Sequence, residues 1–159
     1  MEPVSALSAS EEAAWRALTY VANHLVPVLS EDLAGSGVSL SEYVVLVHVS
    51  EAEDEVLRIG DLAAISGLSA SRMSRLVDDM ASKGWLEKSR HRDDARCTLA
   101  ALAPAGLEVL KQTYPTQLAN VRRRVFDHLS ERETVVLATA LSKVKMALES
   151  VQGRPVRPR

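Results

Sequence analysis

The chain has one cysteine, few aromatic residues and no long apolar run, and each shortage excludes a class of protein. Cys97 cannot form an internal disulfide, and the four histidines (His24, His48, His91 and His128) share no close metal-ligand spacing. No run approaches the roughly 18 uncharged apolar residues that a membrane-spanning helix needs. The N-terminal residues lack the basic start and apolar stretch of a secretory signal. We therefore expect a cytoplasmic protein with no membrane association, metal or cofactor.

Sequence motifs of common enzymes are also absent: there is no P-loop, GxGxxG, HExxH or GxSxG pattern. Hydrophobic residues make up 47% of the 159 residues, which is ordinary for a globular protein. Aromatic residues are only 4%, and Leu, Val and Ala dominate instead, which favours a helix-rich core. The length suits one domain, or one domain with a dimerisation extension. The composition thus predicts a mainly helical protein that is not an enzyme.

The most informative stretch runs from residue 57 to residue 102. Residues 59–65 place apolar side chains at helical spacing, and Ser66-Gly67 then ends the predicted helix because Gly accepts a left-handed conformation. Ser69 is placed to cap a second helix, its hydroxyl accepting a hydrogen bond from a free backbone N–H. A short helix, a turn containing Gly and a capped helix are the signature of a helix-turn-helix.

The second helix, over about residues 70–83, has two distinct faces. Its apolar positions recur at spacings of three, one and three: Met73, Leu76, Val77 and Met80. The opposite face is polar and carries Ser71, Ser74, Arg75 and Asp78, with Arg72 on its flank. Small hydroxyls let a helix enter the major groove of DNA, where an Arg pairs with guanine or phosphate. A solvated face has the same composition, so this helix alone leaves both interpretations open.

A β-hairpin is predicted next. Residues 85–88 read as a strand with alternating burial, and Cys97 to Leu102 read as the return strand. Residues 57–59 are a candidate third strand. The hairpin tip, between the strand at 85–88 and the return strand at 97–102, is charged. It presents Lys88, Arg90, Arg92 and Arg96 to backbone phosphates or a minor groove. A charged tip is also common in proteins that bind no nucleic acid. The specific signal is the order and spacing of all the elements together: short helix, turn, capped helix and charged hairpin. This order predicts a winged helix-turn-helix with duplex DNA as its ligand.

These segments resemble the multiple antibiotic resistance regulator (MarR) family of bacterial repressors. The matching strings are GDLAAISGLS, SRLVDDMASKGWLEK, DAR at 94–96, LAPAG at 102–106 and, upstream, LSEYVVL at 40–46. The resemblance covers residues 10–150. It departs at Ala95, where the family often has a second Arg, and at Pro104, where LTxxG is usual.

The resemblance implies roles for three residues. In the family, the Arg of the D-x-R motif in the hairpin enters the minor groove and its Asp holds that Arg in position, which assigns these roles to Arg96 and Asp94 here. The recognition-helix Arg corresponds to Arg75. Together with the residues chosen from the helix and hairpin patterns, the candidate DNA-binding set is Ser69, Ser71, Arg72, Ser74, Arg75, Arg90, Arg92, Asp94 and Arg96.

Charge is unevenly distributed along the chain, whose net charge is −2. Residues 69–102 contain seven Lys and Arg against five Asp and Glu, a local net charge of +2, so the remainder carries −4. For DNA binding, the local patch matters more than the total. A patch this mild predicts weak non-specific binding.

Long helices flank the predicted DNA-binding lobe. We expect helices over residues 11–33, 40–50, 104–128 and 131–151, with capping boxes at Ser8, Ser39 and Ser130. Pro27 should kink the first, while the apolar spacing continues through Pro115 and favours one kinked helix there rather than two elements. The fold class is therefore mainly α (α+β): a winged helix-turn-helix with long N- and C-terminal dimerisation helices.

The apolar stripes of these flanking helices exceed what a winged-helix core can cover, so they need a partner. A homodimer is the simplest answer, and its two-fold axis would place two recognition helices near 34 Å apart on a palindromic site. The predicted division is a DNA-binding lobe over 38–103, a helical dimerisation region over 8–37 and 104–151, and a disordered tail over 152–159.

The resemblance also implies control by a ligand, since many relatives release DNA when a small phenolic or other anionic aromatic binds. The candidate pocket residues are Trp15, Tyr20, His24, Tyr43 and His48. Core packing is the simpler interpretation of aromatics at helical spacing. The expected function is a transcription factor, favouring a repressor over an activator. Two alternatives stay open: a winged-helix protein–protein adaptor, and a redox sensor acting through Cys97, for which a buried and unreactive thiol is the simpler interpretation.

Overall fold

Helices make up most of the structure, a computed structural model that describes residues 5–91 and 97–151. The helices are α1 (Ala9–Leu33), α2 (Leu40–Ser50), α3 (Ile59–Ser66), α4 (Ala70–Ser82), α5 (Pro104–Arg124) and α6 (Glu131–Val151). The strands are β1 (Val56–Arg58), β2 (Leu86–Arg90) and β3 (Thr98–Leu102). The chain divides into two units, Met1–Leu118 and Ala119–Arg159. The mainly helical fold class with a winged helix-turn-helix is confirmed.

Hydrogen-bonding side chains define where the helices begin, as the sequence predicts. Ser8, Ser39 and Ser130 each exchange hydrogen bonds with the Glu three residues later, so all three capping boxes are present. Gly37 and Gly67 have φ of +76° and +66°, the left-handed conformation that ends the preceding helical segments. Helix α1 begins two residues earlier than expected, directly after its cap.

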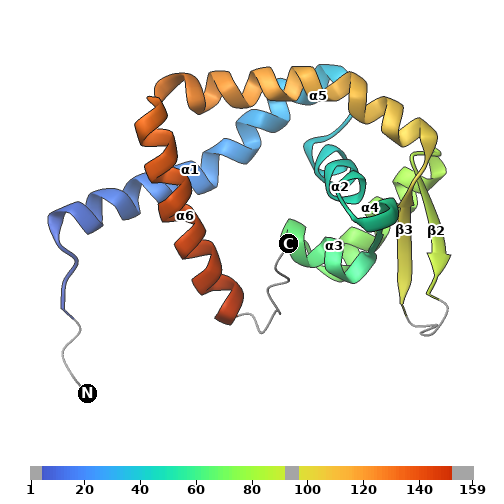
Figure 1. Cartoon of the computed structure of the whole chain (residues 1–159), viewed down its shortest axis with the longest axis horizontal. Helices are drawn as coiled ribbons and strands as arrows, with labels where there is room; N and C mark the ends of the chain where they lie inside the picture. Colours follow the sequence, from blue (N-terminus) through green and yellow to red (C-terminus); the bar gives the residue numbers. More distant parts are fainter. Residues whose placement is uncertain (1–4, 92–96, 152–159) are drawn as a thin grey trace. The chain divides into compact units, whose positions relative to one another are not determined.

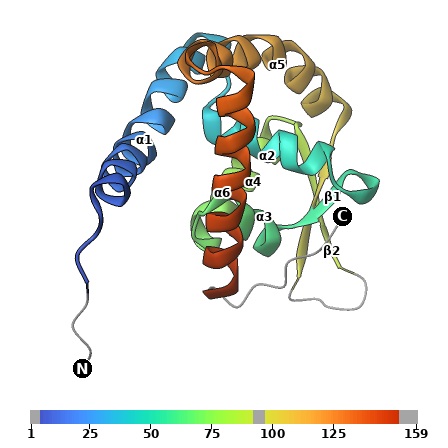
Figure 2. The same cartoon turned by 60° about the vertical axis from the view of Figure 1, so that its left-hand side comes forward.

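The three strands form one antiparallel sheet in the order β1-β3-β2, with Ala100 between Leu57 and Lys88. Figures 1 and 2 show the β2–β3 hairpin beside α4, extending away from the start of α5. The predicted third strand is confirmed. Lys88, which the prediction placed both in the strand and in the tip, belongs to the strand. Two expectations were wrong: Arg90 lies within β2 rather than in the tip, and burial does not alternate along β2. Only Leu86 is buried, because the strand then extends beyond the core.

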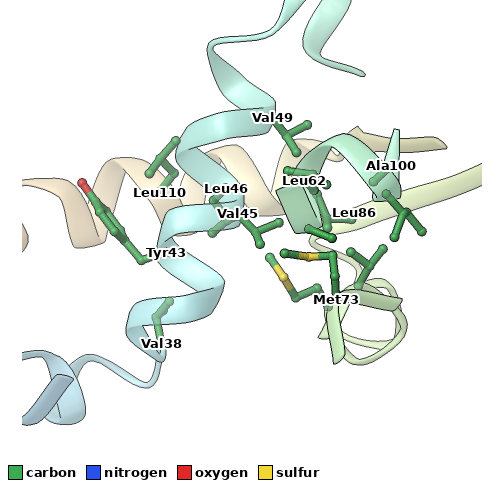
Figure 3. Close-up of a cluster of buried hydrophobic side chains, with 14 of the residues drawn as sticks. Val38, Tyr43, Val45, Leu46, Val49, Leu62, Met73, Leu86, Ala100 and Leu110 are labelled. Atoms are coloured by element: carbon green, nitrogen blue, oxygen red, sulfur yellow. The ribbon is translucent and has the colours of Figure 1, made fainter. Parts of the chain in front are cut away.

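One apolar core joins α2, α3, α4 and the sheet. Figure 3 shows Val45 and Leu46 of α2 in its centre, with Leu62, Met73 and Leu86 on one side and Leu110 on the other. Burying one such side chain fully stabilises the fold by about 1.5–3 kcal/mol. The largest fully buried side chains are Leu33, Val45, Leu46, Val49, Leu62, Met73, Val77 and Met80. This core therefore fixes which face of α4 points inward.

Helix α5 is one continuous helix through Pro115, as the apolar spacing predicts. Its buried face includes Leu110 but then continues with the polar side chains of Thr113 and Gln117. Tyr114 and Leu118 are instead 51% and 40% exposed. Within residues 104–118, the apolar stripe of α5 therefore does not coincide with its buried face.

Neither a single membrane-spanning helix nor a metal-binding cluster stands out in the described part of the chain. No one helix there has the length and apolar character to cross a membrane, although the segments Ala9–Ser36 and Leu40–Ser50, bent by 88°, meet the criteria as a pair. Across residues 5–91 and 97–151, no three His, Cys, Asp or Glu side chains are grouped so that they could hold a metal ion.

Gly106 marks the tightest approach between the first turn of α5 and the hairpin. A Cβ built on it would lie 2.1 Å from the carbonyl oxygen of Trp85 and 3.2 Å from Leu102 Cδ1. That carbonyl oxygen also accepts a hydrogen bond from Ala103 N at 3.1 Å, so the backbone cannot move aside without losing it. Only glycine fits here.

We therefore expect Gly106→Ala to lower the free energy of unfolding by about 1–3 kcal/mol, measured by urea denaturation, because the added methyl overpacks a fixed backbone. Gly60→Ala is the matched control. Its Cβ meets no atom within 4 Å, so the change should be neutral or stabilise the helix by less than about 1 kcal/mol. Equal stability of Gly106→Ala and wild type would contradict this packing.

Candidate nucleic-acid interface

Helix α4 buries one face and presents the other. Met73, Val77 and Met80 are completely buried, so the side chains opposite them are directed outward. The candidate residues Ser69, Ser71, Arg72 and Arg75 are exposed, and Ser74 is partly exposed. Ser69 therefore lies at the start of α4, and the other four predicted residues lie on its outward-facing side.

The N-terminus of α4 is rich in hydrogen-bonding groups. Ser69 Oγ accepts a hydrogen bond from Arg72 N at 3.3 Å and lies 3.3 Å from Ser71 Oγ. Arg75 Nε donates to the Ser71 carbonyl oxygen at 3.4 Å. A helix N-terminus with exposed N–H groups and hydroxyls favours anions such as phosphate. This end of α4 suits the backbone of a nucleic acid.

The hairpin adds basic side chains beside α4. Arg90 is exposed at the end of β2, opposite Thr98. Lys88 of β2 forms an ion pair with Asp78 of α4, which joins the hairpin to the outward face of the helix. Arg92, Asp94 and Arg96 lie outside the described residues, so their roles stay predictions.

A second ion pair lies at the C-terminal end of α4. Neither ion pair was predicted from the sequence. Lys83 Nζ, just after α4, lies 2.5 Å from Glu42 Oε1 at the start of α2. Burial alone would raise the pKa of Glu42, but hydrogen bonds from Lys83 and Ser39 outweigh it and leave that pKa below its usual value. The only sequence signal was the capping box of Glu42, which does not reveal a partner 41 residues away.

The five candidate pocket residues are divided between two helices of the described chain, α1 and α2. Trp15, Tyr20 and His24 lie on α1, where the Tyr20 and His24 rings stack with centroids 4.0 Å apart. Trp15 and Tyr20 are exposed, whereas Tyr43 is buried and His48 is half-buried in α2. None of the five lines either of the two best-formed cavities among the described residues.

One of those cavities lies between α2 and α5 and has a volume of about 330 Å³. The residues that line it are Val47, Ser50, Glu51, Leu110, Lys111 and Tyr114. Burial raises the pKa of the neighbouring Tyr43, with smaller contributions in the same direction from Tyr114 and Glu51. The cavity therefore combines an apolar wall with one cationic side chain (Lys111), one anionic side chain (Glu51) and one phenolic side chain (Tyr114).

The α3–α4 pair and the β2–β3 hairpin together define a winged helix-turn-helix protein. The sequence profile of the MarR family matches residues 36–96. The chain is 30% identical to AbsC, a MarR family transcriptional regulator from Streptomyces coelicolor, over 92% of this chain and 99% of that one, with a TM-score of 0.82. The chain belongs to the MarR family of transcriptional regulators, which confirms that it is not an enzyme.

Two further relatives match along most of their length. Sco3205 of Streptomyces coelicolor, a MarR family regulator whose structure is in complex with DNA, is 30% identical over 90% of this chain and 94% of that one, with a TM-score of 0.81. The transcriptional repressor MprA of Escherichia coli K12 is 24% identical over 139 residues, which is 85% of this chain and 78% of MprA.

Proposed function

We propose that the protein is a dimeric, sequence-specific DNA-binding repressor that acts in the cytoplasm. The one-sided burial of α4 carries the proposal, because it leaves hydroxyls and two arginines outward on a helix that fits a major groove. Residues 38–103 form the DNA-binding lobe, and residues 8–37 and 104–151 form the dimerisation region. The DNA complex of Sco3205 and the repressor MprA support this assignment by similarity.

Each candidate residue has a distinct role in this proposal. Arg75, with Ser71, Ser74 and Arg72 beside it, reads base edges in the major groove, while Ser69 and the N-terminus of α4 contact a phosphate. Arg90 and Arg92 contact phosphates, and Arg96, held by Asp94, enters the minor groove.

Fluorescence anisotropy on the DNA upstream of the protein's own gene and on a scrambled duplex tests the proposal. We expect tight binding to the first only, with the logarithm of affinity falling linearly with the logarithm of salt concentration. Arg75→Ala should weaken specific binding by about 1–3 kcal/mol because it removes a bidentate base contact. Arg16→Ala, an exposed arginine of α1, is the control and should bind as wild type does.

Equal weak binding to both duplexes would count against a local operator. Salt-independent association with a protein and no DNA affinity would favour the adaptor alternative. An Arg75→Ala variant that is folded and binds with unchanged affinity would remove this residue from the interface.

Exposed apolar side chains on α1 and α6 support the homodimer. Large apolar side chains exposed on α6 are Val135, Val136, Leu137, Leu141, Val144, Met146 and Leu148, and those on α1 include Trp15, Leu18, Val21 and Val26. Stripes of this length in water favour association. A two-fold axis between two copies covers the same face on both and pairs two copies of α4 with a palindrome.

Sedimentation equilibrium measures the dimer directly. We expect a mass of twice 17.3 kDa at micromolar concentration. Leu141→Glu together with Val144→Glu should give a monomer, since two charges cannot be buried unpaired. Ser142→Glu adds charge to a hydroxyl-bearing position of the same helix and should leave the dimer intact. A monomeric wild type would contradict the proposal.

The effector in this proposal is a small anionic aromatic, and the α2–α5 cavity is its binding site. A ring packs against Val47, Leu110 and Tyr114, while the anionic group replaces the exposed carboxylate of Glu108, which lies 2.8 Å from Lys111 Nζ, as the partner of Lys111. Binding would release DNA only if it favours a geometry in which the two copies of α4 no longer match the groove spacing.

Benzoate titrated into the protein–DNA complex tests the effector site. We expect DNA release from wild type at concentrations that leave Lys111→Gln bound, because the variant loses the cation. Trp15→Phe should respond as wild type does. If Trp15→Phe resists release while Lys111→Gln responds normally, the site lies on α1 instead.

The redox alternative rests on Cys97, which is a free and half-buried thiol directly before Thr98, at the tip end of the hairpin rather than at its root. Its carbonyl oxygen accepts a hydrogen bond from His91 N at 2.9 Å, which closes the described part of the hairpin. Loss of DNA binding after peroxide treatment in wild type but not in Cys97→Ser would favour this alternative.

A further inference from the structure

The carboxylate of Glu42 has donors on both of its oxygens. Its Oε2 accepts hydrogen bonds from Ser39 N at 2.8 Å and from Ser39 Oγ at 2.7 Å, which caps α2. Its Oε1 accepts from Lys83 Nζ at 2.5 Å, across 41 residues of sequence. The side chain is only 8% exposed. One buried carboxylate therefore joins the start of α2 to the residue that ends α4.

Lys83 also reaches the base of the hairpin. Its Nζ lies 4.5 Å from the centroid of the Trp85 ring, within the range of a cation–π contact. Trp85 is itself fixed by its backbone, since its N–H donates to the Met80 carbonyl oxygen at 3.0 Å and its own carbonyl oxygen accepts from Ala103 N. The ammonium of Lys83 thus contacts α2 and the root of β2 at the end of α4.

Apolar packing sets which face of α4 is buried, but it does not tie the helix to one partner atom. The contacts of Met73, Val77 and Met80 are strong and non-directional. A hydrogen-bonded ion pair is directional. It is also costly to break on one side only, because the remaining buried charge has no compensation.

We propose that Glu42 and Lys83 are positioning residues, which hold the C-terminal end of α4 and the base of the hairpin in the one orientation that fits DNA. This inference rests on the proposed DNA-binding function. The competing interpretation is that the ammonium of Lys83, whose side chain is 43% exposed, contacts a DNA phosphate directly.

A double-mutant cycle separates the two interpretations. Glu42→Gln keeps an acceptor for Ser39 but removes the charge, and Lys83→Met keeps the aliphatic stem but removes the ammonium. We measure anisotropy of wild type, each single variant and the double variant on upstream and scrambled DNA, across a salt series.

For a positioning pair we expect each single change to weaken specific binding at least fivefold. The double variant should be no weaker than the weaker single variant, since one interaction is lost in all three. Binding to scrambled DNA and the salt slope should stay as in wild type, because no phosphate contact is removed. Lys83→Arg, which retains the charge, should stay within about twofold of wild type.

A phosphate contact gives the opposite pattern and would overturn the inference. Lys83→Met would then weaken binding to both duplexes and reduce the salt slope by about one, while Glu42→Gln would have no effect. Additive losses would overturn it as well. If a single variant does not fold, the double variant, which buries no unpaired charge, decides. Reduced affinity for upstream DNA with wild-type binding to scrambled DNA and a wild-type salt slope supports positioning, whereas wild-type affinity or a loss on both duplexes contradicts it.

A readout without DNA keeps this test separate from that of the proposed function. In a Trp15→Phe background Trp85 is the only tryptophan, and its emission should shift in both single variants when the cation leaves the ring or loses its anchor. Unchanged emission in Glu42→Gln would contradict positioning even if wild type shows no preference for upstream DNA. The exposed pair Glu12–Arg16 of α1 is the matched control: Glu12→Gln and Arg16→Met, in the same Trp15→Phe background, should leave the emission of Trp85 unchanged.

Discussion

The burial of one face of α4 is the constraint on which the rest of the DNA-binding lobe depends. Met73, Val77 and Met80 have no exposed surface, so the rotation of α4 about its axis is set by the core. Exposing any of these side chains would forfeit about 1.5–3 kcal/mol. Because the helix period fixes the opposite side, the same burial determines that Ser71 and Arg75 face outward. The polar, outward face of α4 is thus a consequence of the core.

Two ion pairs add directional contacts between α4 and its neighbours, which apolar packing does not provide. Lys83 joins the end of α4 to Glu42 of α2, and Lys88 of β2 joins the hairpin to Asp78 on the outward side of α4. The two pairs differ in environment: Glu42 is buried, whereas Asp78 is mostly exposed and its pair is screened by water and salt. The buried pair is the one that can hold a geometry, while the exposed pair is open to competition from phosphates.

Local patterns predicted most of the fold from the sequence. The capping boxes at Ser8, Ser39 and Ser130 and the turn at Gly67 each depend on residues within three or four positions, so they can be read from the chain alone. The stripe of α4 also predicted the outward residues. The end of the hairpin was less predictable: Lys88 and Arg90 belong to β2, because its pairing with β3 continues beyond the last buried side chain.

What the sequence could not show depends on contacts between distant residues. Glu42 reads as a helix cap, and nothing near it in the chain indicates Lys83. The cavity between α2 and α5 also could not be predicted from the sequence, since Val47 and Tyr114 become neighbours only when the two helices pack together. For this reason aromatic residues on α1 were plausible pocket candidates, although Trp15 and Tyr20 are exposed. The buried face of α5, which includes Thr113 and Gln117, was hidden by the stronger apolar stripe beside it.

Methylation interference on the upstream DNA tests the central claim most directly, because a methyl group on guanine N7 blocks a helix in the major groove. The account predicts two clusters of interfering guanines, related by two-fold symmetry and centred about one helical turn apart. Both clusters should weaken together when Arg75 is replaced by Ala. Binding that is insensitive to N7 methylation, or a single unsymmetrical cluster, would contradict a dimer that reads DNA through α4.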